Sequence, residues 1–339
     1  MNIKTDLLSL HHKELVESLC QQIINENPNI NALCLSGSHW NKQTQIPNYD
    51  IDINYFGTIK KESDIINSTT ARFLISSVKI EISCFSKNNN EDEFLKYSLA
   101  KNIAVLKVNI LWEKNEIFTT LKNKILLKVK EPNWCYNKLI DEFNLIKSWI
   151  NWWKNENTII ENQKKDNDFF HSVIANLLAI ISPIIFRPPS VARKGLFEIK
   201  NILDILQCTV EKKALYSCLG ITHISKSDIL TFFNKLKETY RKVNSINKEY
   251  YLAGISHFIS NNNEQEAIWP IWRGFKECNE IQTSLDGFEQ LKKDLHFNSV
   301  ESVLKKVYEF EKIILSLENK IDCFAEIFYS NLKRSNDFF

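Results

Sequence analysis

Glycine and proline are scarce in this sequence, with only seven of each among its 339 residues. Collagen-like chains and low-complexity chains rich in these two residues are therefore excluded. Hydrophobic residues make up 44% of the chain and aromatic residues 12%, which is enough to form a sizeable core. Because a single hydrophobic core stops growing at about 250–300 residues, we expect a globular protein of two domains.

An excess of charge of either sign is also lacking, since 43 Lys and Arg against 41 Asp and Glu leave a net charge of +2. Binding of a polyanion through total charge needs a larger positive excess, so nucleic acid is not an expected partner. The first 15 residues have no apolar core of a secretory signal, and the longest apolar stretch, 173–186, is interrupted by polar residues and Pro183. That stretch is too short to span a bilayer, so we expect a cytoplasmic protein with no membrane partner.

The eight cysteines form no C-x-x-C pair, and no histidines stand at zinc-finger spacing. The pattern therefore predicts neither a zinc site nor a disulfide framework. We expect the cysteines to be buried free thiols.

The hydrophobic pattern changes near residue 131. Before that point it predicts helices at 11–26, 62–73 and 91–101, and strands at 32–35, 50–56, 78–85 and 105–112. After it, apolar residues recur at helical spacing over 138–154, 168–185, 195–207, 227–243, 247–259 and 299–332. The sequence thus predicts the α+β class, with a small mixed-sheet domain over residues 1–130 followed by an all-helical domain over residues 131–339.

Acidic residues stand on one face of two predicted strands. In the first of these strands, Asp50 and Asp52 alternate with isoleucines, so the two carboxylates share a face roughly 6–7 Å apart. Glu81 stands in the same way in the second, opposite an apolar face. Like charges held together favour a cation between them, and carboxylate oxygens suit Mg²⁺. If the strands are neighbours, the three acids can hold two metal ions about 3.5–4 Å apart, as in phosphoryl or nucleotidyl transfer.

A glycine-serine pair, Gly37-Ser38, follows the first predicted strand, with eleven residues between Ser38 and Asp50. Gly37 has no Cβ and lets the backbone approach a phosphate, while Ser38 offers a hydroxyl and N–H groups. Each feature is weak alone. Together and in this order they indicate a site that holds phosphates and their metal ions.

This order of strand, Gly-Ser, Asp-x-Asp and a later single acid resembles the DNA polymerase β-type nucleotidyltransferase superfamily over roughly a third of the chain. With a helical domain after it, the layout is most similar to antibiotic (aminoglycoside or lincosamide) nucleotidyltransferases. The resemblance implies an enzyme whose catalytic, metal-binding residues are Asp50, Asp52 and Glu81. It further implies that Gly37 and Ser38 bind the nucleotide, and that the cofactor is Mg²⁺, as two ions.

The reaction implied by the resemblance moves a nucleoside monophosphate from an NTP, with ATP expected first, to a hydroxyl of a small molecule, and releases pyrophosphate. Two other functions stay open. One is transfer to a protein or an RNA end, as in toxin–antitoxin or tailing enzymes, and the other is a non-catalytic nucleotide-binding module. The acceptor, the preferred NTP and the oligomeric state, with a homodimer among the options, are not readable from the sequence.

The resemblance also points to basic residues in the helical domain. The segment 186–190 (FRPPS) and the Arg193-Lys194-Gly195 after it lie where such enzymes often have an aromatic-proline loop and a basic residue facing the triphosphate. This position implies that Lys194, with Arg193 and Lys200 as alternatives, binds the nucleotide and neutralises charge on pyrophosphate. The competing interpretation is a helix start with solvated basic side chains.

A general base for the acceptor hydroxyl has two candidates, Glu81 and the acidic run 91–93, although a solvated helix N-terminus explains that run equally well. His39 either contacts phosphate or is a loop residue without a role.

Tryptophans are prominent in the helical domain. The three at positions 149, 152 and 153 have helical spacing, so we expect them in the core or an interdomain contact. The segment 269–273 (WPIWR) is expected in a loop, either buried or lining a substrate surface.

Overall fold

The computed structural model describes residues 3, 10–36, 50–57, 70–75, 78–86, 96–164, 169–243, 245, 247–281 and 286–335. For some strand residues, Asp50 and Glu81 among them, it describes the backbone and not the side chain. The chain divides into two compact units, unit 1 (Met1–Tyr97 and Lys101–Glu131) and unit 2 (Ser98–Ala100 and Pro132–Phe339). The α+β class is confirmed, while the roles predicted for the two parts stay predictions.

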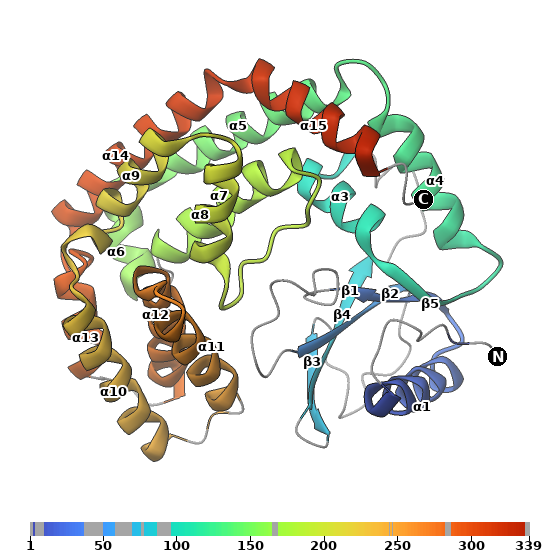
Figure 1. Cartoon of the computed structure of the whole chain (residues 1–339), viewed down its shortest axis with the longest axis horizontal. Helices are drawn as coiled ribbons and strands as arrows, with labels where there is room; N and C mark the ends of the chain where they lie inside the picture. Colours follow the sequence, from blue (N-terminus) through green and yellow to red (C-terminus); the bar gives the residue numbers. More distant parts are fainter. Residues whose placement is uncertain are drawn as a thin grey trace. The chain divides into compact units, whose positions relative to one another are not determined.

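Unit 1 is built on a five-stranded mixed sheet with the strand order β3-β4-β2-β1-β5 (Figure 1). Strands β2 and β4 pair in parallel, and the other neighbours pair antiparallel. The elements of this unit are α1 (Leu10–Glu26), β1 (Ile30–Ser36), β2 (Asp50–Gly57), β3 (Thr70–Ile75), β4 (Val78–Ser86), most of α3 (Leu99–Lys107), β5 (Asn109–Glu113) and α4 (Ile117–Val129).

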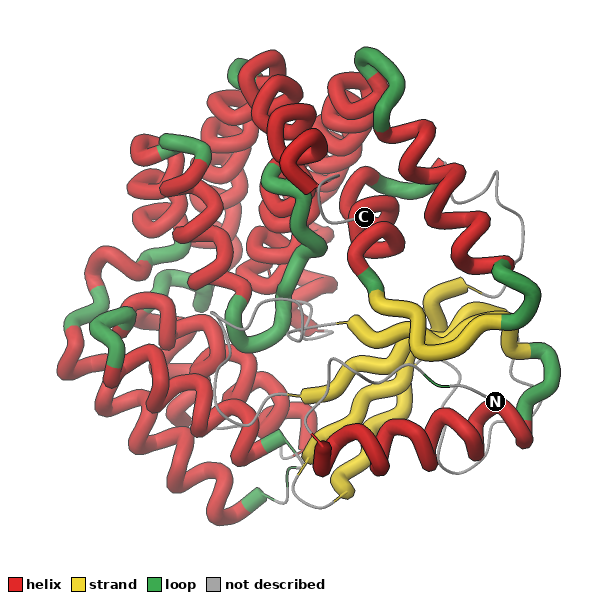
Figure 2. Tube along the Cα trace, turned by 45° about the vertical axis from the view of Figure 1, so that its right-hand side comes forward, coloured by secondary structure: helices red, strands yellow, loops and turns green. Residues whose placement is uncertain are grey.

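Helix α1 lies along one face of the sheet, and Figure 2 shows it running beside the strands. Its buried residues, such as Val16 and Ile23, pack on Leu35, Ile51 and Ile53 from β1 and β2. The apolar residues of β1 and β2 therefore form the face of the sheet that α1 covers, and the residues between them lie on the opposite face.

That opposite face has an apolar part and a polar part. Next to α4 it is apolar, where Phe56 lies edge-on to Phe118 at 5.7 Å and Cys34 is buried. Toward the end of β1 and the start of β2 it becomes polar, and Ser36 and Asp52 are half-buried there. This polar part is the surface on which the predicted acids stand.

Three predictions for unit 1 are wrong in part. The helix predicted at 91–101 does not hold at Tyr97 and Ser98, since α3 begins at Leu99, and its residues 91–95 lie outside the described residues. The strand predicted at 105–112 is confined to Asn109–Glu113, because residues up to Lys107 continue α3, whose Leu99, Ile103 and Leu106 are buried at helical spacing. The helix predicted at 62–73 is wrong over residues 70–73, which belong to β3 and pair antiparallel with β4. The rest of that prediction lies outside the described residues.

Every secondary-structure element described in unit 2 is a helix. Its elements are α5 (Trp134–Trp153), α6 (Glu156–Lys164), α7 (Phe169–Ile184), α8 (Gly195–Ile205), α9 (Thr209–Cys218), η3 (Ile221–His223), α10 (Lys226–Lys242), α11 (Lys248–Ser260), α12 (Glu264–Ile281), α13 (Asp286–Asp294), α14 (Val300–Glu318) and α15 (Ile321–Ser335). The single helix predicted over 299–332 is thus two helices, and both pack against α5 (Figure 1). No helix in the described part of the chain is long and apolar enough to cross a membrane.

Aromatic side chains form much of the core of unit 2. Trp149 stacks on Phe169 at 5.5 Å, and Trp153 meets the same ring edge-on at 5.3 Å, so core packing is confirmed for these two. Trp152 is 50% exposed and is not a core residue. The segment 269–273 is not a loop but lies within α12, where both of its tryptophans are buried.

The cysteine prediction holds for six residues and fails for one. Free, buried thiols are found at Cys20, Cys34, Cys135, Cys208, Cys218 and Cys278. Cys323 is also free but is exposed, because it lies near the start of α15 on the face turned to solvent. The side chain of Cys84 lies outside the described residues.

Candidate functional site

The two strands that carry the predicted acids are neighbours in the sheet. β2 and β4 pair in parallel with Asp52 opposite Glu81, and β1 pairs with β2 so that Ser36 is opposite Asp52. β3 adds Arg72 opposite Glu81. Ser36, Asp52, Glu81 and Arg72 therefore lie next to one another across β1, β2, β4 and β3.

Asp50 belongs to the same face, because it precedes Asp52 by two residues in β2. The residues that alternate with these acids, Ile51, Ile53 and Ile82, are fully buried on the opposite face. Register is strongly specified where one face is buried, since a slip of one residue would turn these isoleucines out of the core. The apolar packing of the sheet thus fixes which face carries the acids.

The residue types at these positions suit a hard divalent cation. Three carboxylate positions lie on two adjacent strands, and Mg²⁺ is commonly held by one or two carboxylates together with substrate phosphates. Among the side chains that the structure describes, no three His, Cys, Asp or Glu are grouped as a metal site would require. Asp50 and Glu81 are not among those side chains, so the metal assignment stays a prediction that their strand positions fit.

Arg72 gives Glu81 a second interpretation that sequence analysis missed. Opposite charges at directly facing positions of an antiparallel pair attract each other, and Arg72 and Glu81 occupy such facing positions of β3 and β4. The sequence signal was the alternation of Thr70 and Arg72 with Ala71 and Phe73, at the end of a stretch that was predicted as helix.

A hydrogen bond on the polar face was also missed. The side-chain amide Nδ2 of Asn54 donates to the hydroxyl of Ser36, linking β2 to β1 beside Asp52. Asn54 is the third polar residue of the alternation in β2, and Ser36 directly precedes Gly37, so the two positions were visible in the sequence although their contact was not.

Several predicted site residues lie outside the described residues. These are Gly37, Ser38, His39 and the acidic run 91–93. Their assignments stay predictions from the sequence.

In unit 2, Lys194 is not a solvated residue at a helix start. It is the residue before α8 and is only 7% exposed, and its carbonyl accepts the backbone N–H of Glu198 at 2.9 Å. Arg193 is buried as well, with its guanidinium 4.0 Å from the ring centre of Tyr250 and its Nη1 donating to the Tyr250 carbonyl at 2.6 Å. Arg193 is thus held against α11, and nucleotide binding by either Arg193 or Lys194 stays a prediction.

The surroundings of Lys194 perturb two titratable groups. Burial raises the pKa of Glu198, against the opposing effect of the positive charges of Lys194 and Arg187. Burial, followed by the charges of Arg193 and Lys194, lowers the pKa of His257. Burial is the larger cause of both shifts, and the neighbouring positive charges oppose it at Glu198 and add to it at His257.

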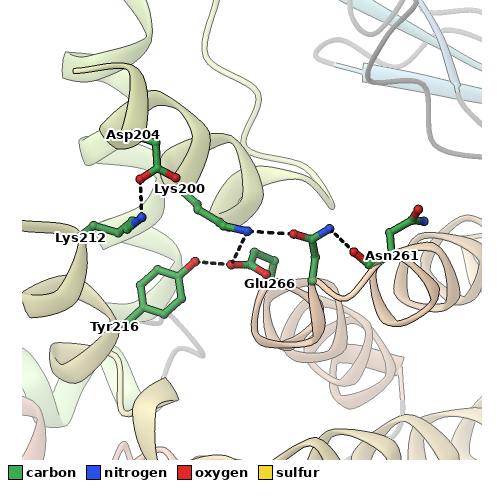
Figure 3. A network of polar contacts seen from close by, with 7 residues as sticks. Lys200, Asp204, Lys212, Tyr216, Asn261 and Glu266 are labelled. Carbon is green, nitrogen blue, oxygen red and sulfur yellow. Dashed lines mark hydrogen bonds and ion pairs between the residues drawn. The ribbon is translucent and has the colours of Figure 1, made fainter. Parts of the chain in front are cut away.

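Lys200, the remaining basic alternative, has protein partners. Its Nζ donates to the Asn263 side chain at 2.8 Å and lies 3.7 Å from the carboxylate of Glu266, which also accepts the Tyr216 hydroxyl at 2.5 Å (Figure 3). Glu266 is only 4% exposed, so removing Lys200 would take away the positive charge that lies beside this buried carboxylate. This network favours a structural role for Lys200 between α8 and α12.

Comparison with known proteins adds little. No protein-family model matches the sequence, and no curated protein matches it significantly. The crystal structure of a nucleotidyltransferase-like protein from Exiguobacterium sibiricum 255-15 aligns with 84% of this chain and 89% of its own, at 11% identity and a TM-score of 0.29. A likeness of that degree carries no argument, so the function must be argued from the residues themselves.

Proposed function

We propose that the protein is a Mg²⁺-dependent nucleotidyltransferase that moves a nucleoside monophosphate from an NTP to a hydroxyl of a small molecule. The observation that supports this most is the register of the sheet, which sets Asp52 opposite Glu81 on the face that also carries Asp50. Lone acids on a strand are often only a solvated surface. Three acids on adjacent strands, with Gly37-Ser38 after the neighbouring strand, suit a metal-bound triphosphate.

In the proposed reaction the acceptor oxygen bonds to the α-phosphorus as the bond from that phosphorus to pyrophosphate breaks. Bound Mg²⁺ would polarise the phosphoryl oxygens and stabilise charge on the attacking and leaving oxygens. Asp50, Asp52 and Glu81 are proposed to hold it, Gly37 and Ser38 to bind the phosphates, and Lys194 to neutralise pyrophosphate. The acceptor proton passes to a carboxylate, for which Glu81 and the acidic run 91–93 are the candidates.

The first test is ligand-dependent stability. Each of the four NTPs is added with and without Mg²⁺, and the free energy of unfolding is expected to rise by about 2.7 kcal/mol at a hundredfold excess over Kd for the preferred nucleotide. Asp52→Asn removes a charge with little change in shape and should abolish the Mg²⁺-dependent part of the gain. Asp322→Asn, at an exposed position in α15, is the matched control and should keep the full gain. An equal gain in Asp52→Asn, or no gain with any NTP, contradicts the proposal.

Glu81 can be assigned by a separate comparison. If it binds the metal, Glu81→Gln should lower the Mg²⁺-dependent gain and leave the ligand-free protein about as stable as before. If it serves only as the partner of Arg72, Glu81→Gln and Arg72→Gln should each cost up to about 1 kcal/mol of ligand-free stability and preserve the nucleotide effect. Chemical unfolding of both variants with and without nucleotide decides between the two.

The acceptor class is tested with the preferred NTP labelled on its α-phosphate. Label that moves to a small molecule in a metabolite extract supports the proposal. Label on a protein or an RNA end would favour the macromolecular alternative instead. Binding without transfer in either case would favour the non-catalytic module.

A further inference from the structure

Two helix ends meet in unit 2 at Gly220 and Leu295. Gly220 is the second residue after α9 and has φ +76°, and Leu295 directly follows α13. A Cβ at position 220 would lie 2.6 Å from the backbone carbonyl oxygen of Leu295, so only glycine allows this approach. The contact fixes the C-terminal end of α9, and η3 after it, against the C-terminal end of α13.

The same contact brings two histidines together. His223 is the last residue of η3, and His296 directly follows Leu295. Their ring centres are 6.4 Å apart with an angle of 73° between the ring planes, and both side chains are exposed. His296 has a left-handed backbone, φ +57°, in a turn where its N–H donates to the carbonyl of Lys293 at 3.0 Å. Glycine usually fills that position after a helix, so a histidine there is uncommon.

The two imidazoles suit a transition-metal ion. Imidazole nitrogens are ligands for Zn²⁺, Ni²⁺ and Cu²⁺, at about 2.0–2.1 Å for Zn²⁺, whereas Mg²⁺ and Ca²⁺ prefer oxygen. Because both rings are exposed, packing does not oppose the rotation of their side chains toward one ion. The C-terminal ends of α9 and α13 meet beside them, and the partial negative charge at such ends favours a cation.

We propose that His223 and His296 together bind one divalent transition-metal ion. The ion joins the end of η3 to the end of α13, and water fills its remaining positions. No cluster of three His, Cys, Asp or Glu is found in the part of the chain that the structure describes, so the site has two protein ligands. Such an open site binds exchangeably, unlike the closed four-ligand sites of structural zinc. It shares no residue with the proposed Mg²⁺ site, so the two proposals stand or fall separately.

The test titrates Ni²⁺ alone into the full-length protein by calorimetry at neutral pH. His223→Gln and His296→Gln should each bind the ion of this site about 100-fold more weakly, because two ligands held together bind far more tightly than either alone. The double variant should bind little more weakly than either single variant, since one remaining imidazole contributes little. His257→Gln in α11 and Cys323→Ala at the exposed thiol of α15 are the controls and should bind like the wild type.

Thermal unfolding gives a second measurement. Ni²⁺ should raise the unfolding temperature of the wild type and of both controls, and this rise should be lost in the two histidine variants. Without metal, the histidine variants should unfold close to the wild type, because both side chains are exposed.

Three results would overturn the shared site. The first is a wild type that binds no Ni²⁺ or keeps its unfolding temperature. The second is a full-affinity ion in either single variant. The third is additive loss in the double variant, which would mean that the two imidazoles bind separate ions.

Discussion

Unit 2 is expected to lose stability steeply above pH 9, because four of its thiols are buried. These are Cys135, Cys208, Cys218 and Cys278. Burial raises the pKa of each, since a thiolate is poorly solvated in the core, and the pKa of Cys218 rises from an ordinary 9.0 to about 12.

The direction of the effect follows from proton binding. A thiol whose pKa is raised in the folded state contributes stability that is fully present below pH 9 and is lost as the pH rises toward its folded pKa. Each thiol costs up to about 1.4 kcal/mol per pH unit well above pH 9, so four cost up to about 5.6 kcal/mol per unit. Burial also lowers the pKa of Lys306 below its ordinary 10.5. Below pH 10.5 the unfolded chain therefore binds this proton more strongly than the folded protein, so the stability due to Lys306 rises with pH. This rise offsets at most the loss due to one thiol.

The measurement is urea unfolding between pH 7.5 and 10 in the presence of a reductant. Tryptophan fluorescence reports mainly on unit 2, which contains six of the eight tryptophans. Cys218→Ala should reduce the slope of unfolding free energy against pH by up to about 1.4 kcal/mol per unit above pH 9, whatever its effect on stability at pH 7.5. Cys323→Ala removes an exposed thiol and should leave the slope unchanged. A flat profile in the wild type, or equal slopes for both variants, would contradict the prediction.

Sequence patterns were sufficient to predict helices and strands that bury one face with regularly spaced apolar residues. The alternation in β2 predicted both the strand and the face of its acids, because Ile51 and Ile53 have to reach the core under α1. The same reasoning predicted α1, because its apolar residues recur at helical spacing and Asn27-Pro28 ends the helix. The face that carries the candidate site was therefore predictable before its neighbours in the sheet were known.

Residues whose surroundings come from distant segments were not predictable. Lys194 and Arg193 look like solvated charges in the sequence, but packing of α8 and the preceding residues against α11 buries both, and Tyr250 is 57 positions away from Arg193. Arg72 was missed because residues 62–73 were predicted as a helix, whereas Thr70–Ile75 is a strand that pairs with β4. Tertiary context overrides local preference in both cases.

Gly57→Ala is expected to destabilise unit 1 by about 3–5 kcal/mol. Gly57 ends β2 with φ +121°, a conformation that L-residues rarely adopt, and a Cβ there would overlap the backbone carbonyl oxygen of Asn29. Because the obstacle is backbone rather than a flexible side chain, the chain cannot yield without moving the start of β1. Hydrogen exchange should become faster in β1 and β2 and stay unchanged in unit 2.

The same variant tests whether the sheet register builds the candidate site. Gly57 pairs with Ile30 at one end of the β1–β2 ladder, and the register shift after Ile30 leads to the pairing of Ser36 with Asp52 at the other end. Displacing the Gly57 end should therefore weaken the Mg²⁺-dependent response to nucleotide at temperatures where the variant is still folded. Gly274→Ala in α12 is the control, since its Cβ would meet chiefly the end of the Leu236 side chain at 2.8 Å, and helix propensity offsets part of that cost. A full nucleotide response in a folded Gly57→Ala protein would mean that the acids do not depend on this register, and the site would have to be sought elsewhere.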